Sequence, residues 1–250
     1  MEYKTGNPGL NERTFAAVPR PAAGEERMTL QGTVNKSFLM LAVLLLAALW
    51  PWVRFFDASG DPASVFGLML VGLVGGFILA LVISFKQTTA PYLALPYAAL
   101  EGLAIGGISA IFERRYPGIA IQAVALTFAV MAVLLVAYRS RLIRVTEHFK
   151  AVVVGATLAI ALLYAVSLIL GFFHIHVPFL NDASPLGIIV SLAIIVVAAL
   201  NLVMDFDFIE TGVEGGAPRY MEWYGAFGLM VTLVWLYLEI LRLLAKTRQR

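Results

Sequence analysis

The chain has 250 residues, of which 60% are hydrophobic and only 14% are charged. A water-soluble domain of this length could not cover so much apolar surface, so the natural solvent of the chain is a lipid bilayer. The formal net charge of +2, without a dense Lys/Arg cluster, argues against a nucleic-acid partner. The absence of cysteine excludes disulfides, thiolate catalysis and cysteine-ligated metals.

Residues 1–36 are polar and rich in Gly, Pro, Glu and Arg, and they lack helical periodicity. We expect this segment to be a mostly disordered arm, because it has too little apolar surface to bury. The arm is expected on the cytoplasmic side of the membrane.

Seven apolar runs follow the arm, and turn or charge signals separate them. Each is long enough for a helix that crosses a bilayer core of about 30 Å, which needs roughly 20 apolar residues. The runs cover residues 37–56, 65–85, 91–112, 118–138, 151–173, 185–208 and 222–244. We therefore predict an all-α polytopic membrane protein: a bundle of seven transmembrane helices over 37–244, followed by a short basic tail at 245–250.

The Lys and Arg residues predict the orientation of the bundle. With seven spans, the arm and the even-numbered loops share one side and hold eleven of these residues, whereas the other side holds seven. Since Lys and Arg mark the cytoplasmic side, we expect a multi-pass protein of the cell membrane with a cytoplasmic N-terminus.

The most informative stretch is Met204–Glu210, at the end of the sixth span, because it places carboxylates at the edge of a hydrophobic run. Such acids usually face a bundle interior or a wet cavity and mark an ion or proton path. Asp205 and Asp207 point about 200° apart on a helix, so only one can face the bundle. We assign Asp205 to the bundle, together with Asn201 four residues earlier, and Asp207 to the interface. The alternative is that both acids only cap the membrane edge.

Glu101 lies almost at the centre of the third span, where an acid costs several kcal/mol unless it is protonated or paired. Gly102 and Gly106 next to it are four residues apart, a spacing that lets helices approach closely. Two interpretations remain for Glu101: a neutral, hydrogen-bonded group that holds helices together, or a titratable group that lines a conduction path.

Two further acids occur in the seventh span. Glu222 at its start is expected at the membrane interface, and Glu239 near its end is expected to form an ion pair with Arg242 at i+3. The chain contains no Gly-rich phosphate loop, nucleophile elbow or HExxH motif, so nothing in it indicates an enzyme or a cofactor.

Four stretches of the chain resemble the Bax inhibitor-1/YccA family, also called the transmembrane Bax inhibitor motif family. They are the opening Gly6-Asn7-Pro8-Gly9-Leu10, which is of the type seen in the bacterial branch, Glu101-Gly102-Leu103, Asp205 with Glu214 nine residues later, and Leu241-Arg242-Leu243-Leu244. The resemblance extends over nearly the whole chain. It implies a seven-helix bundle with a central helix that acts as a pH-sensitive Ca²⁺ leak.

In that family an aspartate of the sixth span pairs with another in the seventh, and protonation alters a gate. Asp205 matches the first aspartate, but this chain has Thr232 at the position of the second, ten residues before Arg242. Asp205 and Thr232 are equally far from the turn near Pro218, so they are expected at similar depth. Glu222 lies ten residues from Thr232, about 15 Å along a helix, and cannot replace the missing acid.

Other partners for Asp205 are open to test. A pair of Asp205 with Glu101 would titrate as a coupled unit. Lys86, a base at the cytoplasmic end of the second span, is a candidate latch for Asp205.

Two classes of function are left. The first is an ion-conducting or ion-exchanging protein, with Ca²⁺ as the transported ion that the resemblance implies and protons as an alternative; hard oxygen ligands suit Ca²⁺, but no metal site can be assigned. The second is a non-conducting membrane regulator that binds other proteins, such as a membrane protease, through residues 1–36.

Overall fold

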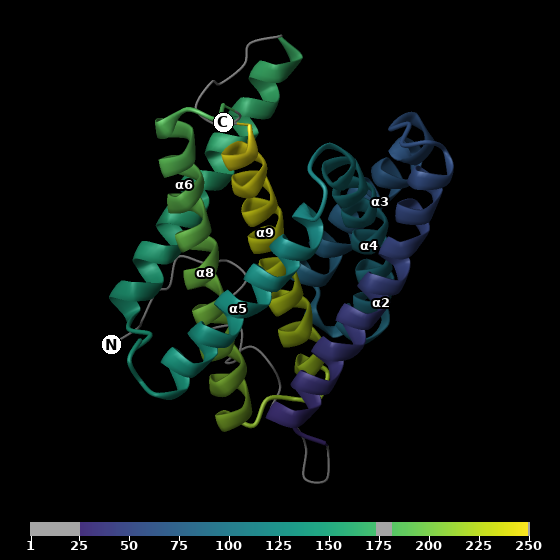
Figure 1. Cartoon of the computed structure of the whole chain (residues 1–250). Coiled ribbons are helices and arrows are strands. Elements are labelled where there is room, and N and C mark those ends of the chain that lie inside the picture. The colour runs from purple at the N-terminus through teal and green to yellow at the C-terminus, as the bar shows by residue number, and fades with distance from the viewer. Residues whose placement is uncertain (1–25, 174–181, 250) are drawn as a thin grey trace. The chain divides into compact units, whose positions relative to one another are not determined.

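The structure, a computed structural model, describes residues 26–173 and 182–249. These residues are almost entirely helical, and seven of their helices are long and apolar enough to cross a membrane, which confirms the predicted all-α seven-helix fold (Figure 1). The helices are α2 (Leu30–Asp57), α3 (Ala63–Phe85), α4 (Ala90–Arg115), α5 (Ile119–Arg139), α6 (Glu147–Phe172), α8 (Pro185–Glu214) and α9 (Met221–Arg248), with a 3₁₀ turn, η1 (Gln87–Thr89), before α4.

Several helices extend beyond the predicted spans. α2 begins at Leu30, because the Thr29 side chain caps it by accepting a hydrogen bond from the Gly32 amide. Residues 30–36, predicted as the end of the arm, are thus the first turns of α2, and residues 1–25 lie outside the described residues. An apolar run marks the stretch within the hydrocarbon, whereas a helix continues until its terminal groups are capped or solvated.

The described residues form two compact units. Unit 1 consists of residues within Ile121–Phe206 and Thr232–Arg250, and unit 2 of residues 26–120 and Asp207–Val231. α8 and α9 each contribute one part to unit 1 and another to unit 2.

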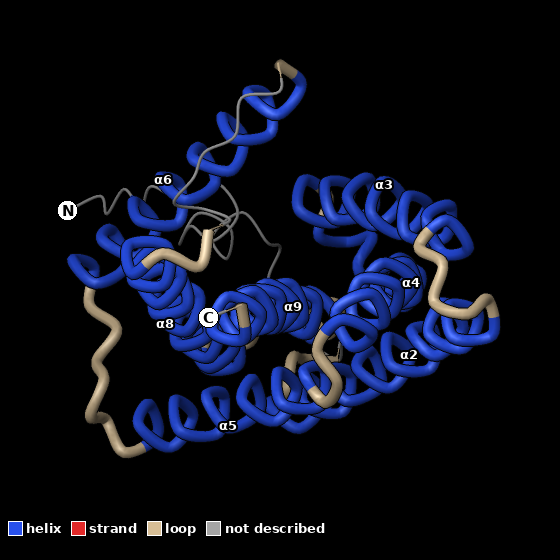
Figure 2. The backbone as a smooth tube through the Cα atoms, turned by 45° about the horizontal axis from the view of Figure 1, so that its top comes forward, coloured by secondary structure: helices blue, strands red, loops and turns tan. Residues whose placement is uncertain are grey.

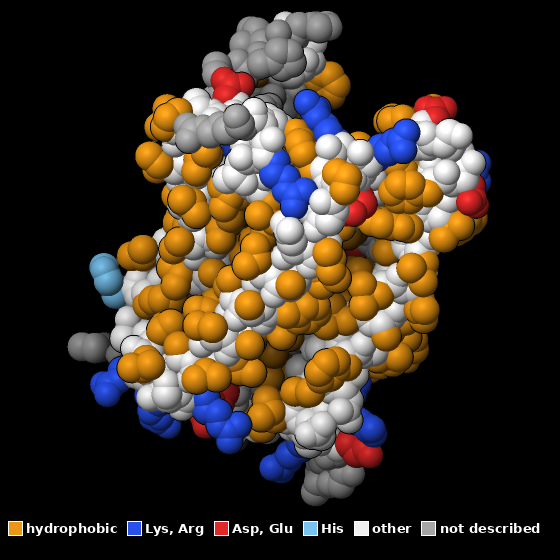
Figure 3. Space-filling view, viewed as in Figure 1, with side chains coloured by type: hydrophobic (Ala, Val, Ile, Leu, Met, Phe, Trp, Pro, Cys, Tyr) orange, Lys and Arg blue, Asp and Glu red, His pale blue; other side chains and the backbone are white. Residues whose placement is uncertain are grey.

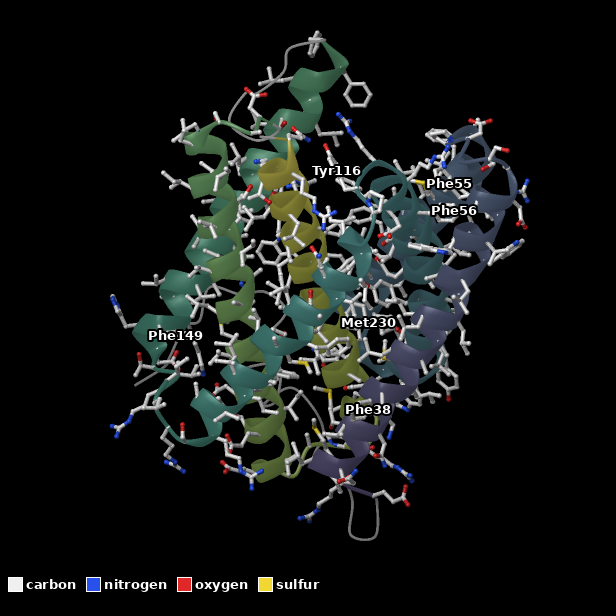
Figure 4. The ribbon with its side chains drawn as sticks, in the orientation of Figure 1. Phe38, Phe55, Phe56, Tyr116, Phe149 and Met230 are labelled. Carbon is white, nitrogen blue, oxygen red and sulfur yellow. The ribbon has the colours of Figure 1, made fainter. Side chains whose placement is uncertain are left out.

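In unit 2, α4 packs against both α2 and α3 (Figure 2). α4 and α2 approach closely at Gly102 and Gly106, as the sequence predicts: a Cβ atom at either position would collide with the backbone of α2. Near the C-terminal end of α2, Phe55 forms a buried cluster with Val65 and Ala110 and an edge-to-face contact with Phe56 (Figure 4).

Unit 2 also joins the segment before α2 to the turn between α8 and α9. The Met28 amide donates to the Ala217 carbonyl at 2.7 Å, and Arg219 forms an ion pair with Glu26. We call the contacts around Glu222 the clasp. In the clasp the amide and hydroxyl of Thr29 each donate to Glu222 Oε1 at 2.8 Å, and the Lys36 ammonium donates to Oε2.

The clasp gives Glu222 partners that the sequence did not predict. This acid lies in the first turn of α9 but is only 2% exposed, so it is a buried and paired group. A Cβ atom at Gly32 would overlap the carboxylate, so a larger residue there would displace Glu222 from the clasp.

Large apolar side chains are exposed on the outer faces of the helices in both units. Examples are Leu46, Phe66 and Leu162, each about two thirds exposed. Hydrophobic side chains also cover much of the surface seen in Figure 3. Surfaces of this kind require a hydrocarbon solvent, and the protein is therefore a multi-pass integral membrane protein.

Replacing Gly102 by Ala tests the close packing of α4 on α2. We expect the free energy of unfolding to fall by about 1–3 kcal/mol, because the added methyl has no room beside Leu44 and Ala47. The matched control is Gly155→Ala in α6, where a Cβ atom meets nothing within 4 Å. Thermal unfolding in detergent should separate the two variants, and equal melting temperatures would contradict the packing described.

Replacing Glu222 by Ala tests the clasp. We expect a loss of about 3 kcal/mol in the free energy of unfolding, because the half-buried Lys36 and the Thr29 amide lose their shared acceptor. Glu214→Ala, at an exposed acid at the end of α8, should change stability by less than about 0.5 kcal/mol. A Glu222 variant as stable as the Glu214 variant would show that the clasp contributes nothing.

Candidate functional site

Asp205 is a buried acid in unit 1. It lies on α8, nine residues before the end of that helix, and is 8% exposed. Among the described residues, its Oδ2 atom is the buried side-chain polar atom without a hydrogen-bond partner. An acceptor buried in this way costs free energy unless a proton or a cation satisfies it, so this oxygen is available to bind either one.

Thr232 of α9 is the neighbour that the structure gives Asp205. The Thr232 hydroxyl donates a hydrogen bond to the Asp205 carboxylate, so the two side chains lie at the same level of unit 1, as the hairpin count expects. Thr232 is itself 7% exposed. A hydroxyl cannot repel the carboxylate as a second acid would, and the pair of Asp205 and Thr232 therefore contains one carboxyl group.

Asn201 lies one turn before Asp205 on α8, and its side chain contacts α6. Its amide nitrogen donates to the Thr157 hydroxyl of α6 at 2.8 Å and to the Val197 carbonyl at 2.9 Å. Asn201 thus links α8 to α6, one turn away from Asp205. The partner Thr157 is not readable from the sequence, because it lies 44 positions away along the chain.

Glu101 lies in unit 2, partly buried on α4. The Tyr97 hydroxyl, one turn earlier on the same helix, donates a hydrogen bond to its carboxylate. Tyr97 is 2% exposed, and its ring meets Phe227 of α9 edge to face with centroids 4.9 Å apart. A Cβ atom at Gly76 of α3 would come within 3.2 Å of Glu101 Oε1, so α3 passes directly beside the carboxylate.

The remaining predicted residues belong to unit 2. Asp207 is partly buried on α8, and Lys86 is exposed at the end of α3. The pairing of Asp205 with Glu101 and the latch between Asp205 and Lys86 would each join unit 1 to unit 2, and they stay predictions.

The predicted ion pair of Glu239 with Arg242 is confirmed, with 3.2 Å between Oε2 and Nη1. The sequence did not predict the third member, Tyr164 of α6, whose hydroxyl donates to Glu239 Oε1 at 2.7 Å. Across the described residues, no three acidic or histidine side chains gather closely enough to hold a metal ion by themselves.

A family model described as "Bax inhibitor 1 like" matches residues 7–249. The chain belongs to the Bax inhibitor 1 like family. Searches of curated proteins and of solved structures give no match. Membership confirms the resemblance, and the matched range likewise covers nearly the whole chain.

Substitutions at Thr232 test its bond to Asp205. In Thr232→Val, which has nearly the same shape, we expect the free energy of unfolding to fall by about 1–3 kcal/mol because Asp205 loses its hydroxyl donor. Thr232→Ser keeps the hydroxyl and should retain most of the stability. Thermal unfolding in detergent checks both, and a Val variant as stable as the wild type would show that the hydroxyl bond to Asp205 contributes nothing.

Proposed function

We propose that this protein is a pH-sensitive cation leak, with Ca²⁺ as its main ion and Asp205 as the carboxylate that controls passage. The observation that carries the proposal is the buried Asp205 with one oxygen unpartnered among the described residues. A structural acid inside a membrane protein normally has both oxygens satisfied. An acid with an open acceptor can exchange a proton for a cation.

The chemistry at Asp205 supports a dependence on pH. A carboxyl group that carries a proton is neutral and is tolerated in an apolar site, whereas an ionised carboxylate there needs a cation beside it. Proton and cation therefore compete for the same oxygen. Carboxylate and carbonyl oxygens are the ligands that Ca²⁺ prefers, and family membership of the chain is consistent with this ion.

Thr232 modifies the proposal at one point. A pair of close acids binds protons in two coupled steps, whereas a single acid beside a hydroxyl titrates in one step. We infer that the leak of this protein follows a simple one-proton dependence at Asp205. Glu101, with its Tyr97 hydrogen bond, is the second candidate group on the path.

The proposal extends to location and class. The excess of Lys and Arg on the side of the N-terminus supports a cytoplasmic N-terminus in the cell membrane. We propose no enzymatic activity and no cofactor other than the transported ion.

Ca²⁺ entry into dye-loaded liposomes that contain the purified protein tests the proposed function. Scanned from about pH 5 to 8, a range in which shifted carboxyl groups titrate, the wild type should show an entry rate that changes with pH. Asp205→Asn should remove this pH dependence, because an amide does not titrate. Asp57→Asn, at an exposed acid at the end of α2, is the matched control and should behave as the wild type.

The same measurement separates the alternatives. Loss of the pH dependence in Glu101→Gln and not in Asp205→Asn would move control of the leak to α4. No entry above that of empty liposomes at any pH, from well-folded protein, would reject conduction and favour a non-conducting regulator that binds other membrane proteins.

A further inference from the structure

Within unit 1, α8 and α9 lie side by side and run in opposite directions (Figure 1, Figure 2). Two contacts fix their register. The Thr232 hydroxyl meets Asp205, and the Lys246 ammonium donates to the Ser191 hydroxyl at 2.9 Å. Fourteen residues separate the two contacts on each helix, about 21 Å at 1.5 Å per residue. The polar groups therefore recur along one seam between the helices.

Midway along this seam the register brings Ala198 of α8 level with Glu239 of α9. Ala198 is fully buried and has a small apolar side chain, so α8 offers Glu239 no polar partner at this level. Glu239, seven residues from both Thr232 and Lys246, is 2% exposed. An acid thus lies about 10 Å along the seam from Asp205, in the interior of unit 1.

The Glu239 carboxylate forms its ion pair with a side chain of the same helix. Arg242 Nη1 lies 3.3 Å from Oε1 and 3.2 Å from Oε2 of Glu239, and it donates to the Tyr164 hydroxyl at 2.6 Å. The guanidinium also stacks on the Tyr164 ring, 5.2 Å from its centroid. One cation therefore contacts every oxygen of the cluster.

Burial within this ion pair is unequal. The Arg242 side chain is 37% exposed, whereas that of Glu239 is 2% exposed. Arg242 can leave by rotating its own side chain toward the membrane interface, which long basic side chains near helix ends readily do. Glu239 cannot follow it, and its carboxylate would then keep only the Tyr164 hydroxyl as a direct partner, a state that a second cation would stabilise.

We propose that Glu239 is a second cation site, and that the Arg242 guanidinium fills it as a tethered cation that a divalent ion such as Ca²⁺ can displace. The site places an acid on the same seam as Asp205, with Tyr164 as a further oxygen ligand. Only its role as a step of the ion path rests on the proposed function; cation binding at Glu239 is testable without any flux.

Tyr164 provides the probe for this site. Tb³⁺ takes oxygen ligands as Ca²⁺ does, and a tyrosine beside the bound ion sensitises its luminescence. The experiment titrates the full-length purified protein in detergent with Tb³⁺ and subtracts the emission of the matching Tyr164→Phe protein. The difference reports binding at Glu239 and excludes Tb³⁺ held elsewhere.

Arg242→Gln removes the tethered cation and keeps a polar side chain. We expect this variant to bind Tb³⁺ at the Tyr164-dependent site about tenfold more tightly than the wild type, or tighter still. The reason is that a close pair of opposite charges contributes at least the free energy of a tenfold change in affinity. Ca²⁺ should compete for the site. Adding Glu239→Gln to this variant should abolish the Tyr164-dependent signal.

The controls separate displacement from a purely structural pair. Arg242→Lys keeps a cation and should bind as weakly as the wild type. Lys150→Gln removes the basic member of a more exposed i,i+3 pair with Glu147 on α6, at 3.3 Å, and should leave the signal unchanged. No Tyr164-dependent emission in either the wild type or Arg242→Gln overturns the proposal, even if one of these proteins folds poorly. The same affinity in both would likewise overturn it.

The role of the site in the path has a separate readout. In liposomes, Arg242→Gln should change the Ca²⁺ entry rate at a given pH, whereas Lys150→Gln should not. Tb³⁺ binding without any Ca²⁺ entry in the wild type would reject the proposed function and retain the site. Ca²⁺ entry that depends on Asp205, without Tb³⁺ binding at Glu239, would do the reverse.

Discussion

Polar groups inside the membrane spans have no water with which to form hydrogen bonds, and this constraint explains most of the contacts described. Hydroxyl groups donate to the carbonyl one turn earlier, as Ser37 does to Thr33 and Thr127 does to Ala123. The charged Lys246 donates to both a carbonyl and a hydroxyl of α8. Against this background an unsatisfied Asp205 oxygen is an exception, and an exception in a membrane span indicates function more strongly than a satisfied acid does.

The fold and part of the site follow from local information in the sequence. Apolar length alone predicts the seven spans, and counting from the turn near Pro218 predicts that Asp205 and Thr232 are level. The i,i+3 spacing predicts the pair of Glu239 with Arg242, which the structure contains. Each of these predictions needs only the helix repeat, which is the same in every sequence.

Contacts between distant segments are not readable in this way. Tyr164 and Glu239 are 75 positions apart, and Thr29 and Glu222 are 193 positions apart. The sequence does not indicate the contact of Glu222 with Thr29, because an acid beside Trp223 at the start of a helix is typical of the membrane interface. Its burial depends on Gly32, a residue whose importance appears only when α2 is placed against the start of α9.

The absence of a second aspartate at Thr232 also changes how charge is distributed along the seam of unit 1. Asp205 brings one negative charge when ionised, the Glu239–Arg242 pair is neutral overall, and Lys246 brings one positive charge. Under the proposed function, a cation that leaves Asp205 toward Lys246 would approach a positive end unless Arg242 moves and exposes Glu239. A low-dielectric interior strengthens this repulsion, so in the proposed path the positive charges would oppose the exit of a cation from Asp205 toward Lys246. The proposed control of passage at Asp205 would therefore also depend on the position of Arg242.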